Sequence, residues 1–486
     1  MIIGKKRRGT VRPLLILPPP LDIFRVASLE VCFGKLTLMA FVLLCLSAIN
    51  SGAASKHSGF VEVGVDRVWS GTTVRFGGLV HEGYAYVAYY DAERWLTVAK
   101  VNVEVVDSPV EKVRLPTRFG GWDAHNSTVL TVDAEGIIHI SGNLHGGGLV
   151  YARGLKPWSL AGLDELRQMT GRSEEQSVTY PTFLHLADGR LAFIFRSGRS
   201  GDGGWYANVW ESPGVWQPLF KGALFGNTWF AQSTSAYPSN FKRDADGIWH
   251  VALVWRMNPD VSTNQRLSYA RSRDLIKWTT SSGKALSVPL SPTNIDVVDD
   301  IKMGQGLLNN VVVGIDAQNR PLISYSRYDA RGHNQGYLAR PNDGDWQRAV
   351  VTDWQGKWKI EGKGTLPGNI GFDSAVQRET CCILFYATQW RAGRQAIKLD
   401  ARSFEVIQRE QRPDIVPSSF RELRTFGLSK GVSRIFPLSD RWGNESAFSL
   451  RWESLRSNAD QPHACAEAVM SSCIPQASEL TVLVPR

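Results

Sequence analysis

The sequence contains few cysteines, and none of them has the spacing of a metal site. There are six cysteines in 486 residues, and no two of them form a Cys-X-X-Cys pair. Structural zinc sites and redox motifs depend on such closely spaced pairs. We expect the adjacent Cys381 and Cys382 to be buried as small hydrophobic residues, since neighbouring cysteines rarely pair with each other. Cys465 and Cys473 have the spacing of a small-loop disulfide in an oxidising compartment.

A hydrophobic run long enough to span a membrane is also missing. The apolar stretch at 36–46 follows Lys35 and leads into small residues at 51–54. It is shorter than the about 20 residues that a spanning helix needs, and its layout is typical of a secretory signal peptide with an apolar region at about 36–49. We therefore expect residues 1–54 to be an export segment and the mature protein, 55–486, to be secreted or periplasmic. The alternative is a short membrane anchor.

No motif for binding DNA or RNA is present. The formal net charge of +9 nevertheless favours an anionic partner, and for an exported protein an acidic polysaccharide or oligosaccharide is expected before nucleic acid. We expect a monomer with no membrane contact after processing. No cofactor is expected to be required for catalysis.

The composition and an internal repeat predict an all-β fold. The chain has 45 glycines, 23 prolines and 17 tryptophans, which suits many short strands joined by tight turns. An acidic-Gly turn followed by an alternating strand recurs at 133–141 and 244–252, with weaker copies near 188 and 316. Successive turn glycines, Gly136, Gly189 and Gly247, are 53 and 58 residues apart, which is close to the size of a propeller blade.

We therefore predict that residues 55–486 form one seven-bladed β-propeller of four-stranded antiparallel blades. A late strand at 448–452 or 479–484 is expected to pair with N-terminal strands, so that few sheet edges remain exposed. The segment 160–169 is the only helical candidate of note.

Polar residues interrupt the repeat where a ligand site is expected. His125 and His145 flank a predicted strand, and the second of them opens a Gly-rich stretch that lets a ligand approach the backbone. Arg196 and Arg256 each close an apolar strand, where a guanidinium suits a carboxylate. His139 and His250 lie inside strands at equivalent repeat positions, so we interpret them as structural.

Tyr180 and Tyr237 each precede a proline just before a strand, where a repeated turn and a functional role are both open. Trp122, beside the first histidine, offers an aromatic face that a sugar can stack on.

Several ordered motifs, namely 125–127, 133–145, 180–203 and 236–238, together resemble the BNR-repeat family of seven-bladed propeller polysaccharide lyases. This family includes ulvan lyases and L-rhamnose-α-1,4-D-glucuronate lyases, and the resemblance covers roughly residues 76–370. It implies catalytic positions at His125, His145, Tyr180 and Arg196. It matches Tyr237 and Arg256 less securely, and we expect these two residues to bind substrate. We also expect Asn126 and Trp122 to bind substrate, although a tryptophan in a propeller is more often a packing residue.

The resemblance implies cleavage of the bond to O4 of a glucuronate residue by β-elimination, as in ulvan or plant-gum arabinogalactan. Arg196, assisted by Arg256, would stabilise the uronate carboxylate, and Tyr180 and His145 would transfer protons. His125 would orient them or share that work. Either Tyr180 or His145 is the base. Two alternatives are a sialidase- or rhamnosidase-like glycoside hydrolase and a non-catalytic carbohydrate-binding propeller.

Overall fold

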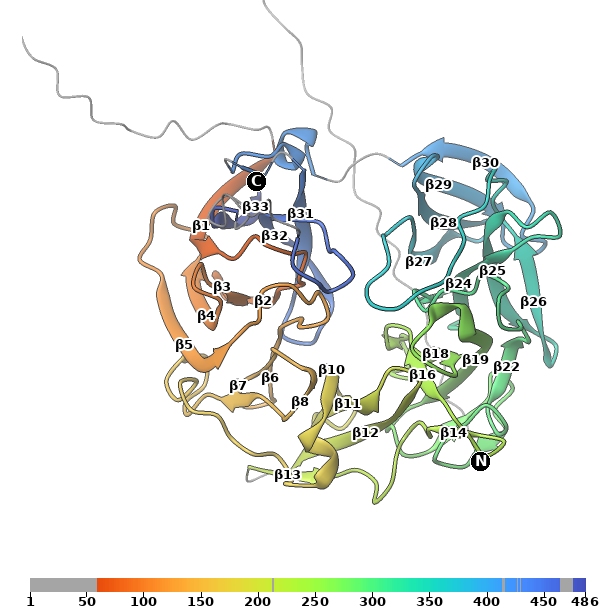
Figure 1. Cartoon of the computed structure of the whole chain (residues 1–486), viewed down its shortest axis with the longest axis horizontal. Coiled ribbons are helices and arrows are strands. Elements are labelled where there is room, and N and C mark those ends of the chain that lie inside the picture. The colour runs from red at the N-terminus through yellow and green to blue at the C-terminus, as the bar shows by residue number, and fades with distance from the viewer. Residues whose placement is uncertain (1–58, 212–213, 413–415, 426, 429, 464–474) are drawn as a thin grey trace, which may run out of the picture. The chain divides into compact units, whose positions relative to one another are not determined.

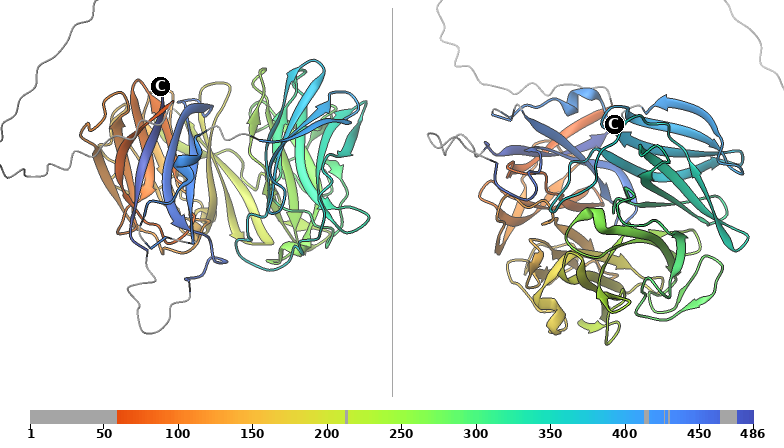
Figure 2. Two further views of the ribbon diagram at one scale, coloured as in Figure 1. Left: turned by 90° about the horizontal axis from the view of Figure 1, so that it is seen from above. Right: turned by 45° about the vertical axis from the view of Figure 1, so that its right-hand side comes forward.

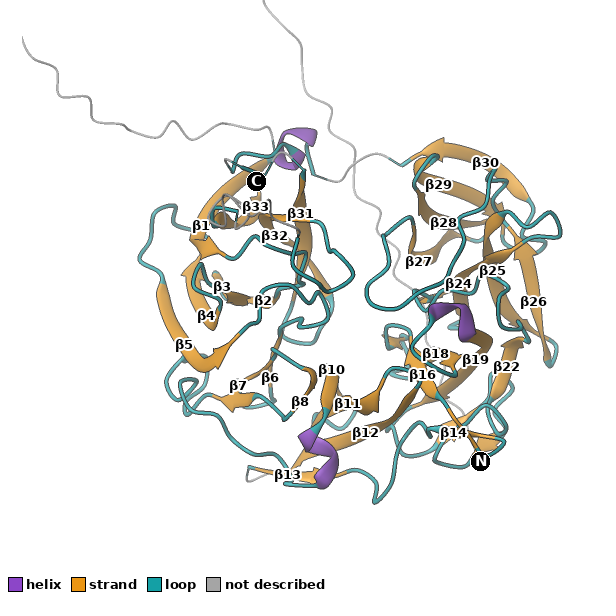
Figure 3. Ribbon diagram, in the orientation of Figure 1, coloured by secondary structure: helices purple, strands orange, loops and turns teal. Residues whose placement is uncertain are grey.

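The computed structural model describes residues 59–486, except 212–213, 413–415, 426, 429 and 464–474. Strands make up about half of this part of the chain (Figure 3), and it also has three short 3-10 helices at η1 (Ser173–Gln176), η2 (Val261–Thr263) and η3 (Ser418–Arg421). The all-β prediction is confirmed. No helix in the described ranges is long and apolar enough to cross a membrane. The predicted export segment, Cys465 and Cys473 lie outside the described residues.

Consecutive strands form antiparallel units that recur along the chain (Figure 1). The most regular units have four strands each. They are β2 (Gly77–His81), β3 (Tyr84–Tyr90), β4 (Trp95–Asn102) and β5 (Glu111–Arg118); β23 (Val312–Ile315), β24 (Pro321–Tyr328), β25 (Asn334–Asn342) and β26 (Asp345–Val350); and β27 (Ile370–Glu379), β28 (Cys382–Gln389), β29 (Gly393–Asp400) and β30 (Val406–Gln411).

The units in between are less regular. One comprises β6 (Val129–Val132), β7 (Ile138–Ser141) and β9 (Tyr151–Arg153). The next comprises β8 (His145–Gly147), β10 (Val178–His185), β11 (Leu191–Arg199), β12 (Asp202–Glu211) and β13 (Val215–Pro218). A third comprises β16 (Ser235–Pro238), β17 (Lys242–Arg243), β18 (Trp249–Arg256), β19 (Asn264–Ser272), β20 (Trp278–Thr279), β21 (Ala285–Leu286) and β22 (Asp296–Asp299). A separate hairpin joins β14 (Thr228–Trp229) to β15 (Gln232–Ser233).

The last unit combines strands from both ends of the described chain. β31 (Gly431–Ser439), β32 (Glu445–Leu455) and β33 (Ser478–Pro485) run antiparallel in sequence, and β33 then pairs along its length with β1 (Phe60–Val68). These four strands lie side by side in Figure 1 and in the views of Figure 2. The predicted pairing of a late strand with an N-terminal strand is confirmed.

Central strands are buried on both faces. Every residue of β18 is buried, as are six of the eight residues of β24. A continuous apolar strand of this kind needs packing partners above and below it, which fits sheets that stack face to face. Single parallel bridges, such as Leu79 to Ser439 and Ile315 to Val376, join the first strands of neighbouring units.

An aspartate explains the repeated turn that the sequence shows. Asp133 Oδ1 accepts hydrogen bonds from the backbone N–H groups of residues 135 and 137. Asp244 and Asp316 do the same: the Oδ1 atom of each accepts the backbone N–H groups two and four residues further along the chain. Gly136 and Gly247 follow with φ of +82° and +79°, which glycine adopts without steric cost. The turn is therefore an Asx turn closed by a left-handed residue.

The two histidines interpreted as structural are buried in matching networks. His139 Nδ1 lies 2.8 Å from Tyr151 Oη and its Nε2 lies 3.3 Å from Asp133 Oδ2. His250 makes the same contacts with Tyr269 and Asp244, at 2.6 and 2.9 Å. Burial lowers the pKa of both histidines, and it outweighs the opposing aspartate bonds.

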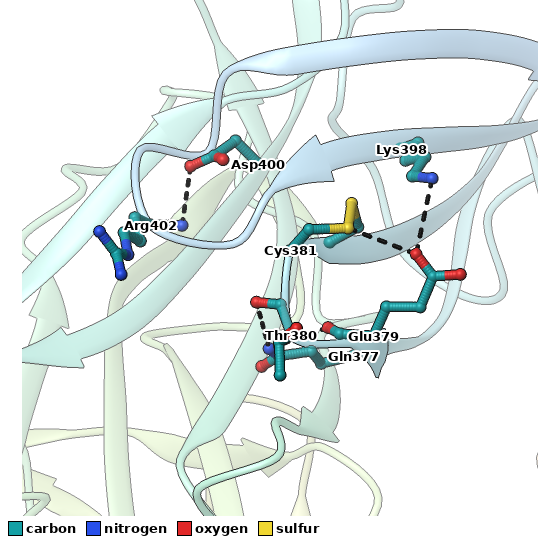
Figure 4. The surroundings of a disulfide bond; sticks show 8 residues. Gln377, Glu379, Thr380, Cys381, Lys398, Asp400 and Arg402 are labelled. Carbon is teal, nitrogen blue, oxygen red and sulfur yellow. Dashed lines mark hydrogen bonds and ion pairs between the residues drawn. A yellow bond between two sulfur atoms is a disulfide. The ribbon is translucent and has the colours of Figure 1, made fainter.

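Two expectations are wrong. Residues 160–169 form turns instead of a helix, because Gly162 takes φ of +88° and so breaks the right-handed path. Cys381 and Cys382 are joined by a disulfide (Figure 4). The tight turn between β27 and β28 brings the two sulfur atoms together; Cys382 is buried as expected, whereas Cys381 is exposed.

Candidate active site

Strand pairing brings the predicted residues to neighbouring strand ends. β10 pairs with β11, where Thr179 lies opposite Arg196, and also with β8, where Thr179 lies opposite His145. β16 pairs with β18 and places Tyr237 opposite Val254, two residues from Arg256. A parallel bridge from β12 to β16 connects these two sets of strands.

Tyr180 lies at an irregularity in β10. The register with β11 shifts between Thr179 and Thr182, and Pro181 has no N–H to give to the ladder, so the strand bulges here. Tyr180 itself has φ of +57°, a left-handed conformation that costs a residue with a side chain about 1 kcal/mol. Such strain is found most often at functional sites.

The Tyr180 ring occupies the middle of the cluster. It stacks on Trp205 at a centroid distance of 6.0 Å and lies 5.9 Å from the His125 ring. The guanidinium carbon of Arg196 lies 4.9 Å from its centroid. Burial raises the pKa of Tyr180 to about 12, helped by Tyr237 and opposed by the two nearby arginines. The phenol therefore keeps its proton at neutral pH.

Two buried guanidinium groups lie over the neighbouring Tyr237 ring, and neither forms an ion pair with a carboxylate among the described residues. Arg196 is 2% exposed and Arg256 is 8% exposed. Both donate to Tyr237 Oη, at 3.2 and 3.3 Å, and Tyr237 Oη also lies 2.6 Å from Ser200 Oγ. Among the residues that the structure describes, Arg196 Nε has no hydrogen-bond partner.

Arg256 is held by two asparagine side chains. Its Nε donates to Asn264 Oδ1 at 2.7 Å, and its Nη2 donates to Asn309 Oδ1 at 2.8 Å. These neutral acceptors fix the guanidinium but carry no charge. A backbone hydrogen bond from Ser262 and the charge of Arg256 both contribute to lowering the pKa of Asp260. A buried charge is costly unless it is paired, so an anion placed beside the two arginines would be stabilised.

Asp123 joins the two predicted histidines. Its Oδ1 lies 2.8 Å from His125 Nδ1, its Oδ2 is hydrogen-bonded to His145 Nδ1, and the two rings stack at 4.2 Å. Burial lowers the pKa of His125, but hydrogen bonds to Asp123 and Asp460 outweigh it and raise the value to about 9. The His125 ring is therefore cationic at neutral pH.

Asp460 approaches the same ring from a distant part of the sequence. Its Oδ2 lies 3.4 Å from His125 Nδ1, and it accepts the N–H and the hydroxyl of Thr365 at 2.9 and 2.7 Å. Burial raises the pKa of Asp460, but the bonds from His125 and Thr365 lower it by more. The loop around Thr365 and the segment before β33 are thus tied to the site.

Two predicted residues contribute structure around the cluster. Trp122 packs edge-on against Trp69, at 5.6 Å between centroids. Asn126 is buried, its side-chain amide donates to Asp123 O, and its carbonyl accepts the Tyr90 hydroxyl at 2.6 Å. These contacts hold the loop that carries Asp123 and His125.

Sequence reasoning missed several polar residues of the cluster. Ser200 lies within the motif at 180–203, and Asn264 lies opposite Arg256 in the β18–β19 register. The sequence around each of these two residues could therefore have pointed to it. Asp460, Thr365 and Asn309 had none, since no repeat or motif marks them.

Asp123, His125 and His145 also have the ligand atoms to hold a metal ion, since these atoms lie within 4.8 Å of one another. Glu379, Cys381 and Cys382 are similarly close. The sulfur atoms of Cys381 and Cys382 are joined in the disulfide and offer no thiolate, so this group of three residues does not suit a metal ion.

Residues 84–354 match the model of a family described as "BNR repeat-containing family member". A search of curated proteins gives no match. Among solved structures, an ulvan lyase of polysaccharide lyase family PL25 bound to -[GlcA(1-4)Rha3S]- has a TM-score of 0.55 at 14% identity, covering 82% of this chain and 94% of that chain. The polysaccharide lyase Uly1 has a TM-score of 0.54 at 14% identity, with 85% and 90% covered. Likeness at these identities shows a shared fold.

Proposed function

The chain belongs to the BNR repeat-containing family, and on this premise we propose that it is a polysaccharide lyase that cleaves the bond to O4 of a glucuronate residue by β-elimination. The observation that carries the proposal is the pair of buried arginines, Arg196 and Arg256, which lack a carboxylate partner in the described part of the chain and lie beside a protonated phenol and two histidines. The similar ulvan lyase structure holds a glucuronate–rhamnose ligand, which supports the same substrate class here.

In this proposal Arg196 binds the uronate carboxylate and Arg256 assists it through Tyr237. A cation at this position lowers the energy of the negative charge that the carboxylate takes up when C5 loses its proton. The C5–H electron pair then forms the C4=C5 double bond, and the C4–O4 bond breaks. The departing O4 receives a proton, so the products are an unsaturated uronate and a free hydroxyl group.

We assign the base to His145 and the acid to Tyr180. Asp123 holds Nδ1 of His145, which leaves Nε2 as the nitrogen that can accept a proton. The Tyr180 phenol keeps its proton because burial raises its pKa to about 12, so it suits protonation of O4. His125 is cationic beside them and adds to the stabilisation of the carboxylate.

Hydrolysis by two carboxyl groups fits this site less well. Such enzymes need one carboxylic acid that keeps its proton. Burial favours the protonated form of Asp123 and Asp460, but hydrogen bonds from the histidines hold the pKa of both below the ordinary value. Both acids therefore remain ionised.

We further propose that residues 1–54 are an export segment and that 55–486 form one seven-bladed β-propeller, secreted or periplasmic and monomeric. The recurring antiparallel units and the pairing of β33 with β1 support the propeller. The substrate would be ulvan or a plant-gum arabinogalactan. Assaying both polymers for an unsaturated uronate distinguishes them, and binding without product would favour a sugar-binding propeller.

Replacing Arg196 by alanine tests the proposal. The double bond of the product is conjugated with the carboxylate and absorbs ultraviolet light, so the reaction can be followed directly. Loss of one charge-stabilising group costs roughly 100- to 1,000-fold in rate. Arg190→Ala, at the other end of the same hairpin and engaged in ion pairs with Asp188 and Glu211, is the matched control. Full activity in folded Arg196→Ala protein would refute the assignment.

A further inference from the structure

A basic cavity of about 510 Å³ lies outside the site described above. Three arginines, Arg320, Arg340 and Arg402, line it together with four side-chain amides, among them those of Gln347 and Gln377, and no acidic residue lines it. It lies at the beginning of β24 and the end of β25, whereas Arg196 and Arg256 lie at the ends of the corresponding strands β11 and β18. The cavity and the candidate active site share no residue.

The cavity arises where the repeat loses a histidine. In two upstream copies the turn aspartate is bonded to a histidine six residues later, but Leu322 stands six residues after Asp316. Arg320 and Arg340 approach Asp316 Oδ2 instead, at 2.8 and 3.8 Å. Asp316 thus faces two guanidinium groups, and Asp400 interacts electrostatically with Arg340 and Arg402. Three guanidinium groups against two carboxylates leave an excess of positive charge here.

Arg340 is buried and firmly held. It is 5% exposed, and it donates to Ala401 O at 2.7 Å and to Gln347 Oε1 at 3.1 Å. Its Nε has no hydrogen-bond partner among the described residues. The guanidinium is therefore fixed at the cavity wall with one donor left to satisfy.

The turn that carries Arg402 is fixed beside the Cys381–Cys382 disulfide (Figure 4). Cys381 O accepts the N–H of Ala401 at 2.7 Å, and Asp400 Oδ1 accepts the N–H of Arg402 at 2.9 Å. In the described part of the chain, no hydrogen bond or ion pair involves the Arg402 guanidinium. Two arginines thus flank the same space, one held by hydrogen bonds and one whose guanidinium makes none among the described residues.

We propose that this cavity is a second binding site, which takes a carboxylate or sulfate group of an acidic sugar chain. Arginine matches the planar or tetrahedral oxygens of such groups through paired N–H donors. The side-chain amides offer both donors and acceptors to neighbouring hydroxyl groups. The site holds a remote part of the chain, so it adds to binding of a long polymer and takes no part in bond cleavage.

Isothermal titration calorimetry with a glucuronate-containing oligosaccharide tests this site, using protein with Tyr180→Phe so that the probe is cleaved only slowly during the titration. Two binding events are expected. Arg402→Gln should weaken one of them by about tenfold, the usual worth of a charge-assisted hydrogen bond. Arg331→Gln, which removes an exposed arginine from a turn at the other end of the same strands, is the control. Arg320→Gln is the second variant, in case the first fails to fold.

The carboxyl-reduced oligosaccharide should lose the event that Arg402→Gln weakens. Equal binding of that neutral probe, or an unchanged isotherm in both arginine variants, would overturn the proposal. Stronger binding of a DNA oligonucleotide at the same residues would also overturn it. The rate with a short substrate should be the same in Arg402→Gln and unmutated protein, so failure of the second site is distinguishable from failure of the lyase proposal.

Discussion

The substitution Asp123→Asn removes the negative charge of Asp123 and keeps the size and shape of the side chain, so it isolates the electrostatic role of this residue. The ordinary pKa of 6.5 rises to about 9 at His125, and each factor of ten in proton affinity is worth about 1.4 kcal/mol. The cationic form of His125 is therefore stabilised by about 3 kcal/mol net, and because burial opposes this shift, the two carboxylates contribute at least that much. Asp123 accepts the shorter bond, 2.8 Å against 3.4 Å for Asp460. We assign about 2 kcal/mol of this energy to Asp123.

The pH dependence of this loss has a definite sign. A histidine whose pKa is raised by folding stabilises the protein fully below pH 6.5, and that contribution disappears as the pH rises through about 9. The pKa of Asp123 is lowered from 3.8, so its carboxylate persists down to acidic pH. The free energy of unfolding should thus differ between Asp123→Asn and unmutated protein by about 2 kcal/mol near pH 6, and by much less near pH 10.

Urea unfolding at the two pH values measures this difference. Asp133→Asn is the matched control, since Asp133 is also bonded to a histidine, but burial lowers the pKa of His139. Its destabilisation should therefore be the same near pH 6 and near pH 10. A destabilisation by Asp123→Asn that does not shrink at high pH would refute the assignment of a cationic His125. Lyase activity should fall by roughly 100-fold or more in Asp123→Asn, because Asp123 orients the proposed base His145.

Two other predictions concern Tyr180 and the disulfide. Tyr180→Phe keeps the ring that stacks on Trp205 but removes the proposed acid, so product formation should fall by roughly 100-fold or more while the midpoint of thermal unfolding changes little; an unchanged rate would contradict the role. Mass spectrometry of a non-reducing digest should find the peptide with Cys381 and Cys382 lighter by two hydrogen atoms than its reduced form, and labelling of both thiols without a reductant would contradict the bond.

The sequence predicted best what the repeat itself determines. Asp133, Asp244 and Asp316 each begin the same Asx turn. In each copy the aspartate carboxylate accepts the backbone N–H two residues later, so the turn depends only on the local sequence. The Cys381–Cys382 bond was mispredicted because the expectation relied on how rarely adjacent cysteines pair in general. That frequency takes no account of the backbone conformation of the turn between β27 and β28.

The candidate site shows why local patterns find only part of a function. His145, Tyr180 and Arg196 lie on strands that are close in sequence and paired in one sheet, so their proximity follows from the order of the motifs. Asp460 reaches His125 because the C-terminal strands return to pair with β1 and the chain before β33 passes the first units. That contact depends on how the ends of the fold meet. Asp460 nevertheless helps to set the charge of His125, so an electrostatic property of the site depends on a residue outside every motif that located it.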